Sequence, residues 1–459
     1  MPYIPHTDRE REAMLEAIGV KTVDELFADV PAQMRFPRLH LPEPLSEIEA
    51  LNELRELSEA NLETLHTTCF LGAGAYNHFI PSAVQHILLR GEFYTAYTPY
   101  QPEICQGTLQ AIFEYQSLIA QLTGMEVANA SHYDGATATA EAVILALNQV
   151  RHRKKIVLSP GLHPQYREVV RTYMQGVDVE IGGDEAPANL QELQERSRAD
   201  SLASRVDEAT ALVIAPYPTF LGEVEDLAPL AESVHRKGAL LAVVANPIAL
   251  GLLKPPGEMG ADVACGEGQP LGIPLSFGGP YLGFFATRQA FVHKMSGRLV
   301  GQTQDTEGRR GYVLTLSARE QHIKRARASS NICTNQGLMA LAAAVYLSQM
   351  GKQGLRRVAE LCYHRAHYAA ERLSQVAGFS LASRGPFFHE FVLRCPRPVA
   401  EINRFLLDEW GILGGYDLGR DFPGLQGHML VAVTELNTRE DIDSLVTALS
   451  ELPEKGGLK

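Results

Sequence analysis

The segment ALVIAPYPTFLGEVEDLAPLAESVHRKGALLAVVANPIALG, residues 211–251, decides the fold class. Two short apolar runs, 211–217 and 239–245, enclose the stretch 227–238, which has the pattern of a helix. A strand, a helix and a second strand in this order favour two parallel strands joined by a crossover helix. The segment therefore predicts an α/β architecture.

The surrounding sequence repeats this alternation. Further apolar runs that we expect to be strands lie at 155–159, 177–182, 262–266 and 281–287. Together the runs predict a mostly parallel sheet, and ligands of such sheets bind at the carboxyl ends of the strands. The loops that follow the strands are therefore the first places to look for chemistry.

The start of the chain, residues 1–65, is predicted to be a helical arm and not an independent domain. It contains three Ser/Thr-x-x-Glu capping boxes, which begin at Thr7, Thr22 and Ser46. After the third box, apolar residues recur every three positions and predict one apolar stripe along a helix. The stripe consists of Leu45, Ile48, Leu51, Leu54 and Leu57.

Two further domains are expected. Residues 66–330 form the predicted large α/β domain. Residues 331–459 begin with long helical stretches and continue with the apolar runs 388–395 and 428–436. We expect this last part to be a smaller α+β domain.

Composition excludes several classes of protein. Lys and Arg total 41 against 54 Asp and Glu, so the net charge is −13, which argues against binding to nucleic acid or to an anionic membrane. The six cysteines are isolated, no two of them at zinc-ligand spacing, so we expect neither disulfides nor a metal site. No apolar run is long and unbroken enough to span a bilayer. These features favour a cytoplasmic protein.

Two loops contain residues suited to a cofactor. In DGATATAEA (134–142), the backbone N–H groups of Gly135, Ala136 and Thr137 are candidates for binding a phosphate at a helix start, although such a start is more often a plain cap. His163 follows a predicted strand and precedes a helix. Its ring could stack on a planar cofactor, but without context a hydrogen-bonded loop histidine is the more common case.

Two other loops stand out by composition. The Gly- and Pro-rich stretch 261–288 leads from one predicted strand into another, and its length suggests that it wraps a ligand. The segment GEFYTAYTPYQPEICQG (91–107) is rich in tyrosine. Aromatic side chains with polar tips suit an interface or a pocket wall, with ordinary surface packing as the alternative.

These loops have the order and spacing seen in the aminotransferase-like (fold type I) pyridoxal-phosphate enzymes, and the chain resembles the glycine decarboxylase P-protein family. The most characteristic stretches are TAYTPYQPEICQG (95–107), LQAIFEYQSLIAQLTGMEVANASHYDGATA (109–138) and EGRRGYVLTLSAREQHIKRARASSNICTNQ (307–336). The likeness covers nearly the whole chain.

The resemblance implies a division of labour. In many bacteria the P-protein consists of two homologous chains, alpha and beta, and a lysine of beta forms the Schiff base with pyridoxal phosphate. Here Gln269 lies at or beside that position, and no lysine occurs between Lys254 and Lys294. A neutral amide cannot form an imine. The chain is thus similar to alpha, with no catalytic residue of its own.

A second difference from the active chains agrees. Active members of the family have an aspartate in the fifth strand, which pairs with the pyridine nitrogen of the cofactor. Val243 and Val244 lie there in this sequence, and Asn246 is the only polar candidate. We therefore interpret the pocket as vestigial. The cofactor-type residues that remain in it are Gly135, Ala136, Thr137 and His163.

The resemblance also implies a reaction and its partners. Glycine is decarboxylated with pyridoxal phosphate held by beta, and the aminomethyl group is transferred to the lipoyl disulfide of the H-protein, which is the oxidant. The expected partners are the beta subunit, in a heterodimer doubled to a tetramer, together with lipoylated H-protein and glycine.

Subunits of this fold commonly lend residues to the pocket of their neighbour. Two segments are placed to do so by hydroxyl and amide donors: Tyr97, Thr98, Tyr100, Gln101 and Glu103 in the first, and Ser330, Asn331, Thr334 and Asn335 in the second. A cationic run precedes the second segment and could attract the glycine carboxylate or an acidic H-protein, or could simply be a solvated helix face. It consists of Arg319, His322, Lys324, Arg325 and Arg327.

Two alternatives remain open at this point. The chain could be a scaffold that only stabilises beta. It could also be a self-sufficient pyridoxal-phosphate enzyme that uses a displaced lysine such as Lys254.

Overall fold

The computed structural model describes residues 6–64 and 67–453. The chain packs as two compact units, Met1–Leu62 and Glu63–Lys459. The domain boundary expected at residues 65 and 66 lies outside the described residues. The boundary expected at residue 330 stays a prediction.

The first unit contains helices α1 (Asp8–Ile18) and α2 (Glu47–Glu59), and both begin with the predicted capping box. The prediction at Thr22 was wrong in part. Thr22 caps a short 3₁₀ helix, and the carboxylate that should return to it binds the backbone N–H of Lys21 at 3.1 Å. No side chain of α1 or α2 is buried. The whole predicted leucine-rich stripe is exposed: Leu45, Ile48, Leu51, Leu54 and Leu57.

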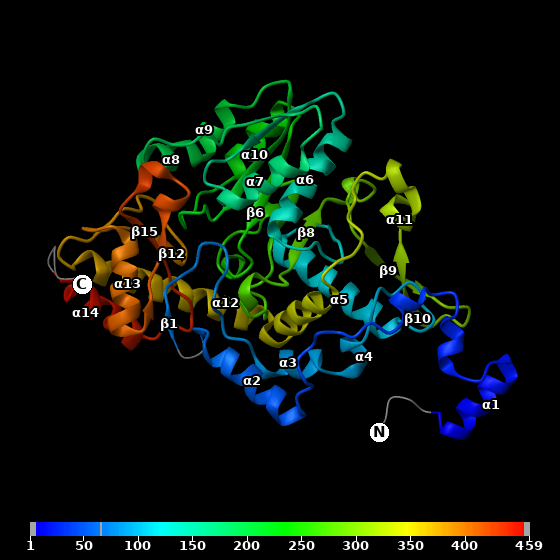
Figure 1. Ribbon diagram of the computed structural model, residues 1–459. Helices are drawn as coiled ribbons and strands as arrows, with labels where there is room; N and C mark the ends of the chain where they lie inside the picture. The colour runs from blue at the N-terminus through cyan, green and yellow to red at the C-terminus, as the bar shows by residue number, and fades with distance from the viewer. Residues whose placement is uncertain (1–5, 65–66, 454–459) are drawn as a thin grey trace. The chain divides into compact units, whose positions relative to one another are not determined.

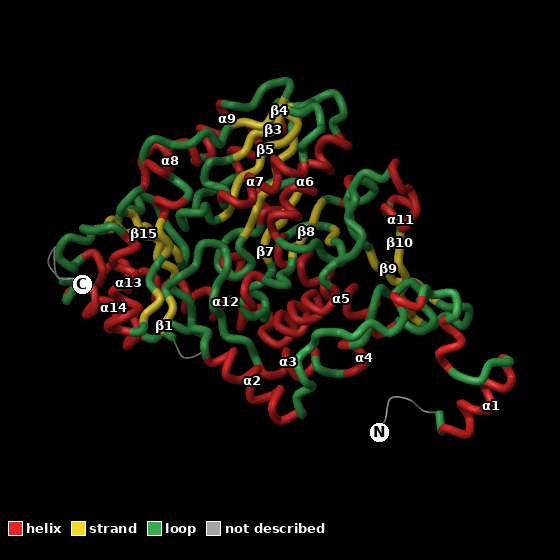
Figure 2. Tube along the Cα trace, viewed as in Figure 1, coloured by secondary structure: helices red, strands yellow, loops and turns green. Residues whose placement is uncertain are grey.

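A seven-stranded sheet forms the centre of the second unit (Figures 1 and 2). Its strands are, in spatial order, β2 (Val127–Ala128), β8 (Gly283–Thr287), β7 (Val263–Glu267), β6 (Leu240–Ala245), β5 (Thr210–Tyr217), β3 (Lys155–Leu158) and β4 (Glu180–Gly182). β8 runs antiparallel to both of its neighbours, and the remaining pairs are parallel. The predicted mostly parallel sheet is therefore confirmed.

Helices cover both faces of this sheet (Figure 2). Successive strand residues point to opposite faces, and accordingly Val243 and Val244 belong to two different apolar clusters. The cluster of Val243 includes residues of α5 (Gln106–Thr123), α10 (Ala228–Arg236) and α12 (Gly337–Ser374). The cluster of Val244 includes residues of α6 (Gly135–Gln149) and α7 (Pro164–Tyr173). Burial on both faces explains why β5 and β6 read as continuous apolar runs.

The C-terminal part contains an antiparallel sheet of four strands, in the order β11 (Ser380–Leu381), β12 (Glu390–Arg394), β15 (His428–Ala432) and β14 (Tyr416–Asp417). Helices α13 (Val399–Trp410) and α14 (Arg439–Ser450) share its apolar core. α12 runs from the large sheet to this part (Figure 1). It bends at Gly351, which has a φ of +57°, a conformation that glycine adopts with little strain. The predicted α+β character is confirmed.

Smaller elements complete the unit. β1 (Thr68–Cys69) pairs in parallel with β13 (Ile412–Leu413), and β9 (Leu299–Gln304) forms a hairpin with β10 (Arg310–Thr315). The remaining helices are α3 (Ser82–Leu88), α4 (Gly91–Tyr94), α8 (Leu190–Ser197), α9 (Ala199–Ser204) and α11 (Gln321–Lys324). Within the described residues, no helix has the length and apolar character needed to cross a membrane.

Candidate functional site

A cavity lies at the carboxyl ends of β5, β6 and β7, where ligands of parallel sheets bind. Its lining includes His163, Asn246 and Glu267. The cavity measures only ≈ 80 Å³, whereas small-molecule sites usually measure about 300–1,000 Å³. The side chains around it therefore decide what the site can still bind.

Gln269 is 1% exposed and is bonded to the backbone through its whole amide. Its Oε1 accepts from the N–H of Tyr76 at 2.9 Å, and its Nε2 donates to the carbonyls of Tyr76 at 2.9 Å and Ile273 at 2.8 Å. The side-chain amide thus pairs with both the N–H and the carbonyl of Tyr76, as the backbone of a neighbouring strand would. Gln269 holds one side of the cavity in place and offers no group for covalent chemistry.

Glu267 lies two residues before Gln269, and its carboxyl group is bonded to the start of α6. Its Oε2 accepts from the N–H of Gly135 at 3.0 Å, and the Asp134 carboxylate accepts from the N–H of Thr137 at 2.7 Å. Burial raises the pKa of Glu267 to about 7, despite the hydrogen bonds from the backbone. Two of the three N–H groups predicted to bind a phosphate are therefore bonded to carboxylates of the chain.

His163 lies at the predicted place after β3 and caps α7. Its Nδ1 accepts from the N–H of Gln165 at 3.2 Å, so the proton is on Nε2, which donates to the carbonyl of Ala73 at 2.9 Å. Burial lowers its pKa, and the ring is neutral at pH 7. One face of the ring stacks on Tyr166, with centroids 5.0 Å apart. The ring therefore packs on a tyrosine of the same chain.

Every residue of β6, the strand in which the resemblance led us to look for an acid, is apolar. Val243 and Val244 are buried in β6. Asn246, just beyond the strand, accepts from the N–H groups of Ile248 and Ala249 at 2.9 and 3.2 Å, and its amide lies 3.2 Å from His389 Nε2. Asn246 thus caps a helical turn, and no carboxylate of β6 reaches the cavity.

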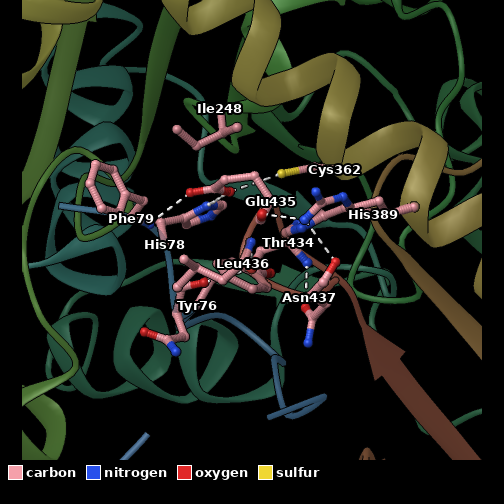
Figure 3. A network of polar contacts seen from close by, with 12 residues as sticks. Tyr76, His78, Phe79, Ile248, Cys362, His389, Thr434, Glu435, Leu436 and Asn437 are labelled. Atoms are coloured by element: carbon pink, nitrogen blue, oxygen red, sulfur yellow. Dashed lines mark hydrogen bonds and ion pairs between the residues drawn. The ribbon is translucent and has the colours of Figure 1, made fainter. Parts of the chain in front are cut away.

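The segment 72–79, named here the closing segment, contributes Gly74 and Tyr76 to the cavity lining and is also held at its far end. There, His78 Nδ1 lies 2.7 Å from the Glu435 carboxylate, which also accepts from the N–H of Phe79 at 2.7 Å and from the Cys362 thiol at 3.3 Å (Figure 3). Burial alone would raise the pKa of Glu435, but His78 and the hydrogen bonds lower it to about 2. The anchor joins the closing segment to α12 and to the turn after β15.

Comparison with known proteins now identifies the family. The family model described as the glycine cleavage system P-protein matches residues 1–449. The chain belongs to this family. A probable glycine dehydrogenase (decarboxylating) subunit 1 from Thermomicrobium roseum is 57% identical over 451 residues, which cover 98% of this chain and 99% of the relative. The resemblance found in the sequence, including the type of subunit, is confirmed, and the chain takes part in glycine decarboxylation.

Solved structures confirm the fold. A glycine decarboxylase (P-protein) of the glycine cleavage system, crystallised in inhibitor-bound form, is 46% identical and aligns with a TM-score of 0.87 over 98% of this chain and 100% of that one. A variant of C-DES with glycine covalently linked to its PLP cofactor aligns with a TM-score of 0.59 at 16% identity, over 84% of this chain and 97% of that one. The P-protein chain therefore has the fold type I architecture of pyridoxal-phosphate enzymes.

That architecture implies pyridoxal phosphate, but the residues of this P-protein chain do not fit the cofactor. The Gln269 amide is bonded to the backbone and offers no amine, Glu267 holds the N–H of Gly135, and Tyr166 stacks on His163. A Cβ added to Gly135 would come within 2.3 Å of the Tyr166 hydroxyl, which shows how tightly this corner is filled. Lys254 is exposed and is not part of the cavity lining, which argues against a displaced Schiff-base lysine.

The two segments expected to reach a neighbouring subunit meet on the surface. Tyr97, Thr98, Thr334 and Asn335 line one groove of ≈ 190 Å³. Tyr97 is 86% exposed, so its ring is not packed against the rest of the described chain. Exposed aromatic side chains beside polar groups are typical of an interface before the partner binds.

Arg298, which no sequence pattern marked, joins these two segments. It is 3% exposed, and its guanidinium donates to the Tyr100 hydroxyl at 3.1 Å, the Cys333 carbonyl at 2.6 Å and the Asn335 side chain at 3.3 Å. The only sign in the sequence that Arg298 is buried was its position between Gly297 and the apolar start of β9. Arg298 fixes the relative position of the two segments.

The other expected residues are placed differently. Gln101 and Glu103 are exposed on the turn that leads into α5. Ser330 and Asn331 line a separate hollow of ≈ 620 Å³, where the Ser330 hydroxyl donates to Glu141 at 2.6 Å. In the cationic run, Arg319 points inward to the Met295 carbonyl. The remaining four are exposed: His322, Lys324, Arg325 and Arg327.

Proposed function

We propose that this chain is the subunit of a two-chain glycine decarboxylase that lacks the Schiff-base lysine. The subunit-1 designation of its relatives implies a second subunit, and that subunit holds pyridoxal phosphate. The complex decarboxylates glycine and transfers the aminomethyl group to the lipoyl group of the H-protein. The observation that carries the proposal is the Gln269 amide, which is fully bonded to the backbone. We assign Gln269 to a position at or beside the lysine of the cofactor-binding chain.

The chain contributes more than a scaffold in this proposal. The groove formed by Tyr97, Thr98, Thr334 and Asn335 offers hydroxyl and amide donors at the surface, and Arg298 holds both of its sides together. Hydroxyl and amide groups are suited to a phosphate that is already bound by another chain. We assign this groove to the edge of the partner's cofactor site.

Reconstitution tests the assignment of labour between the chains. Neither chain alone should release carbon dioxide from glycine in the presence of lipoylated H-protein, and mixing the two should restore the reaction. The visible absorbance of bound pyridoxal phosphate should accompany the partner and be missing from this chain. The exposed variant Lys254→Ala serves as a control and should give a fully active complex. Cofactor absorbance from this chain alone, lost in Lys254→Ala, would point instead to a displaced lysine.

Thr334→Ala should weaken retention of pyridoxal phosphate by the complex about ten- to a hundredfold, the effect of losing a hydrogen bond to a charged group. The Thr334 hydroxyl makes a weak local contact of 3.5 Å with the Asn335 carbonyl, so the fold should not depend on it. Equilibrium dialysis of the complex measures the effect. Thr447→Ala, at an exposed position of α14, is the matched control. Unchanged retention in Thr334→Ala would leave the chain with a scaffold role alone.

A further inference from the structure

The start of α6 already binds an anion that belongs to the chain itself. Helix N-termini attract anions because their free N–H groups and the helix dipole point outward. At α6, the Glu267 carboxylate takes the N–H of Gly135. Asp134 alone supplies the capping box of this helix with Thr137, so a second carboxylate is not needed as a cap. Another reason is required for Glu267 to be held there.

Glu267 also accepts from two further backbone N–H groups. Its Oε1 accepts from the N–H of Gln269 and from the N–H of Leu282, both at 3.0 Å. Together with Gly135, three backbone N–H groups, one of them from the same segment two residues on, converge on one buried carboxylate. Such convergence of backbone donors is typical of sites that bind an oxyanion.

We propose that Glu267 is the built-in anion ligand of the cavity, in the place where a phosphate would otherwise be bound. The consequence is that two independent obstacles keep pyridoxal phosphate out of this chain. Gln269 removes the covalent bond, and Glu267 occupies the donors that would hold the phosphate. Restoring a lysine alone, in Gln269→Lys, therefore leaves the phosphate without a place.

The remaining space agrees with this proposal. Tyr166 packs against Gly135 on one side and stacks on His163 on the other. A cavity of ≈ 80 Å³ remains beside them, which is enough for a small ion once a carboxylate is removed but not for a whole cofactor. A small anion, inorganic phosphate, is therefore the suitable probe.

The experiment removes the internal anion and supplies an external one. The melting temperature of full-length Glu267→Ala is measured against the concentration of inorganic phosphate, with chloride at matched ionic strength as the reference. We expect a saturable rise in melting temperature that exceeds the rise seen in wild type. Phosphate stabilises many folded proteins without binding, so saturation and the difference from wild type are the two criteria.

Two matched variants separate the explanations. Glu390→Ala removes another buried carboxylate of the same cavity, one that accepts from Ala73 and Tyr76 and lies at no helix start; it should respond to phosphate as wild type does. Glu267→Gln keeps the size of the side chain and an acceptor oxygen for the same N–H groups. Its melting temperature should therefore respond to phosphate as that of wild type does. If Glu267→Ala does not fold, Glu267→Ser, which also removes the carboxylate, takes its place and should show the saturable rise.

A phosphate response of Glu267→Ala no larger than that of wild type and Glu390→Ala would overturn the proposal, as would a saturable response of Glu267→Gln. The measurement needs neither the partner subunit nor glycine. Its failure would leave the proposed function untouched, and failure of the reconstitution would leave this assignment untouched.

Discussion

Arg298→Ala should lower the free energy of unfolding by about 3–5 kcal/mol, the cost of breaking a buried charged network by removing one partner. The substitution leaves the Cys333 carbonyl and the Asn335 side chain without their donor. It also takes a cation away from the buried carboxylate of Glu320, which lies 4.0 Å from the guanidinium. Loss of the link to Tyr100 should further release the two segments of the groove from one another.

Hydrogen exchange measures the local part of this effect. Amides at 97–105 and 331–337 should exchange faster in Arg298→Ala, and the complex should retain pyridoxal phosphate less well. Arg298→Lys keeps the charge but lacks the planar fork of donors, so its effect should be intermediate. Arg288→Ala is the control, because Arg288 also donates to two backbone carbonyls, those of Gly260 and Ala261, away from the groove. Unchanged exchange at both segments in Arg298→Ala would show that Arg298 does not position them.

Wild type should lose stability as the pH rises from 5 to 8, relative to the double variant Glu267→Gln/Glu390→Gln. Burial raises the pKa of each of these carboxyls to about 7, from an ordinary value of 4.5. The folded chain then binds more protons than the unfolded chain between these two values, so the contribution to stability is complete below pH 4.5 and is lost as the pH approaches 7. The loss is on the order of 3 kcal/mol for each carboxyl.

Glutamine imitates the protonated acid in size and removes the titration. Melting temperatures of wild type and the double variant should therefore diverge between pH 5 and pH 7 and level off towards pH 8, while the titration of all other groups cancels in the comparison. Glu168→Gln, on the exposed surface of α7, controls for the loss of a carboxylate. Parallel curves for wild type and the double variant would mean that neither Glu267 nor Glu390 changes its proton affinity on folding.

The alternation of apolar runs was sufficient to predict most of the large sheet. β5 and β6 are buried on both faces, and such strands have to be apolar at every position. The antiparallel direction of β8 was not predictable, because an apolar run has the same pattern in either direction. β2 was missed because it has only two residues and takes its place through pairing with β8.

Little of the candidate site could be predicted from the sequence. Gln269 stands out by its place in a characteristic loop, at or beside the position where the resemblance implies a lysine, and this assignment stays a prediction. The bond between Glu267 and Gly135 joins positions 132 residues apart, and Arg298 reaches a tyrosine 198 residues away. Only the folded chain brings these residues together. The same holds for Tyr166, whose stacking on His163 depends on the turn of α7.

The hydrogen bonds of Gln269 suggest how an enzyme of two homologous chains can place catalytic activity in one chain and high stability in the other. A pocket that performs chemistry has to keep polar groups poised for a substrate, and this readiness lowers stability. In this chain the Gln269 amide satisfies both backbone groups of Tyr76, and under the proposed division of labour its pocket is free of that demand. Sequence change in this half can therefore optimise rigidity, and the strain that catalysis requires can be confined to the other half.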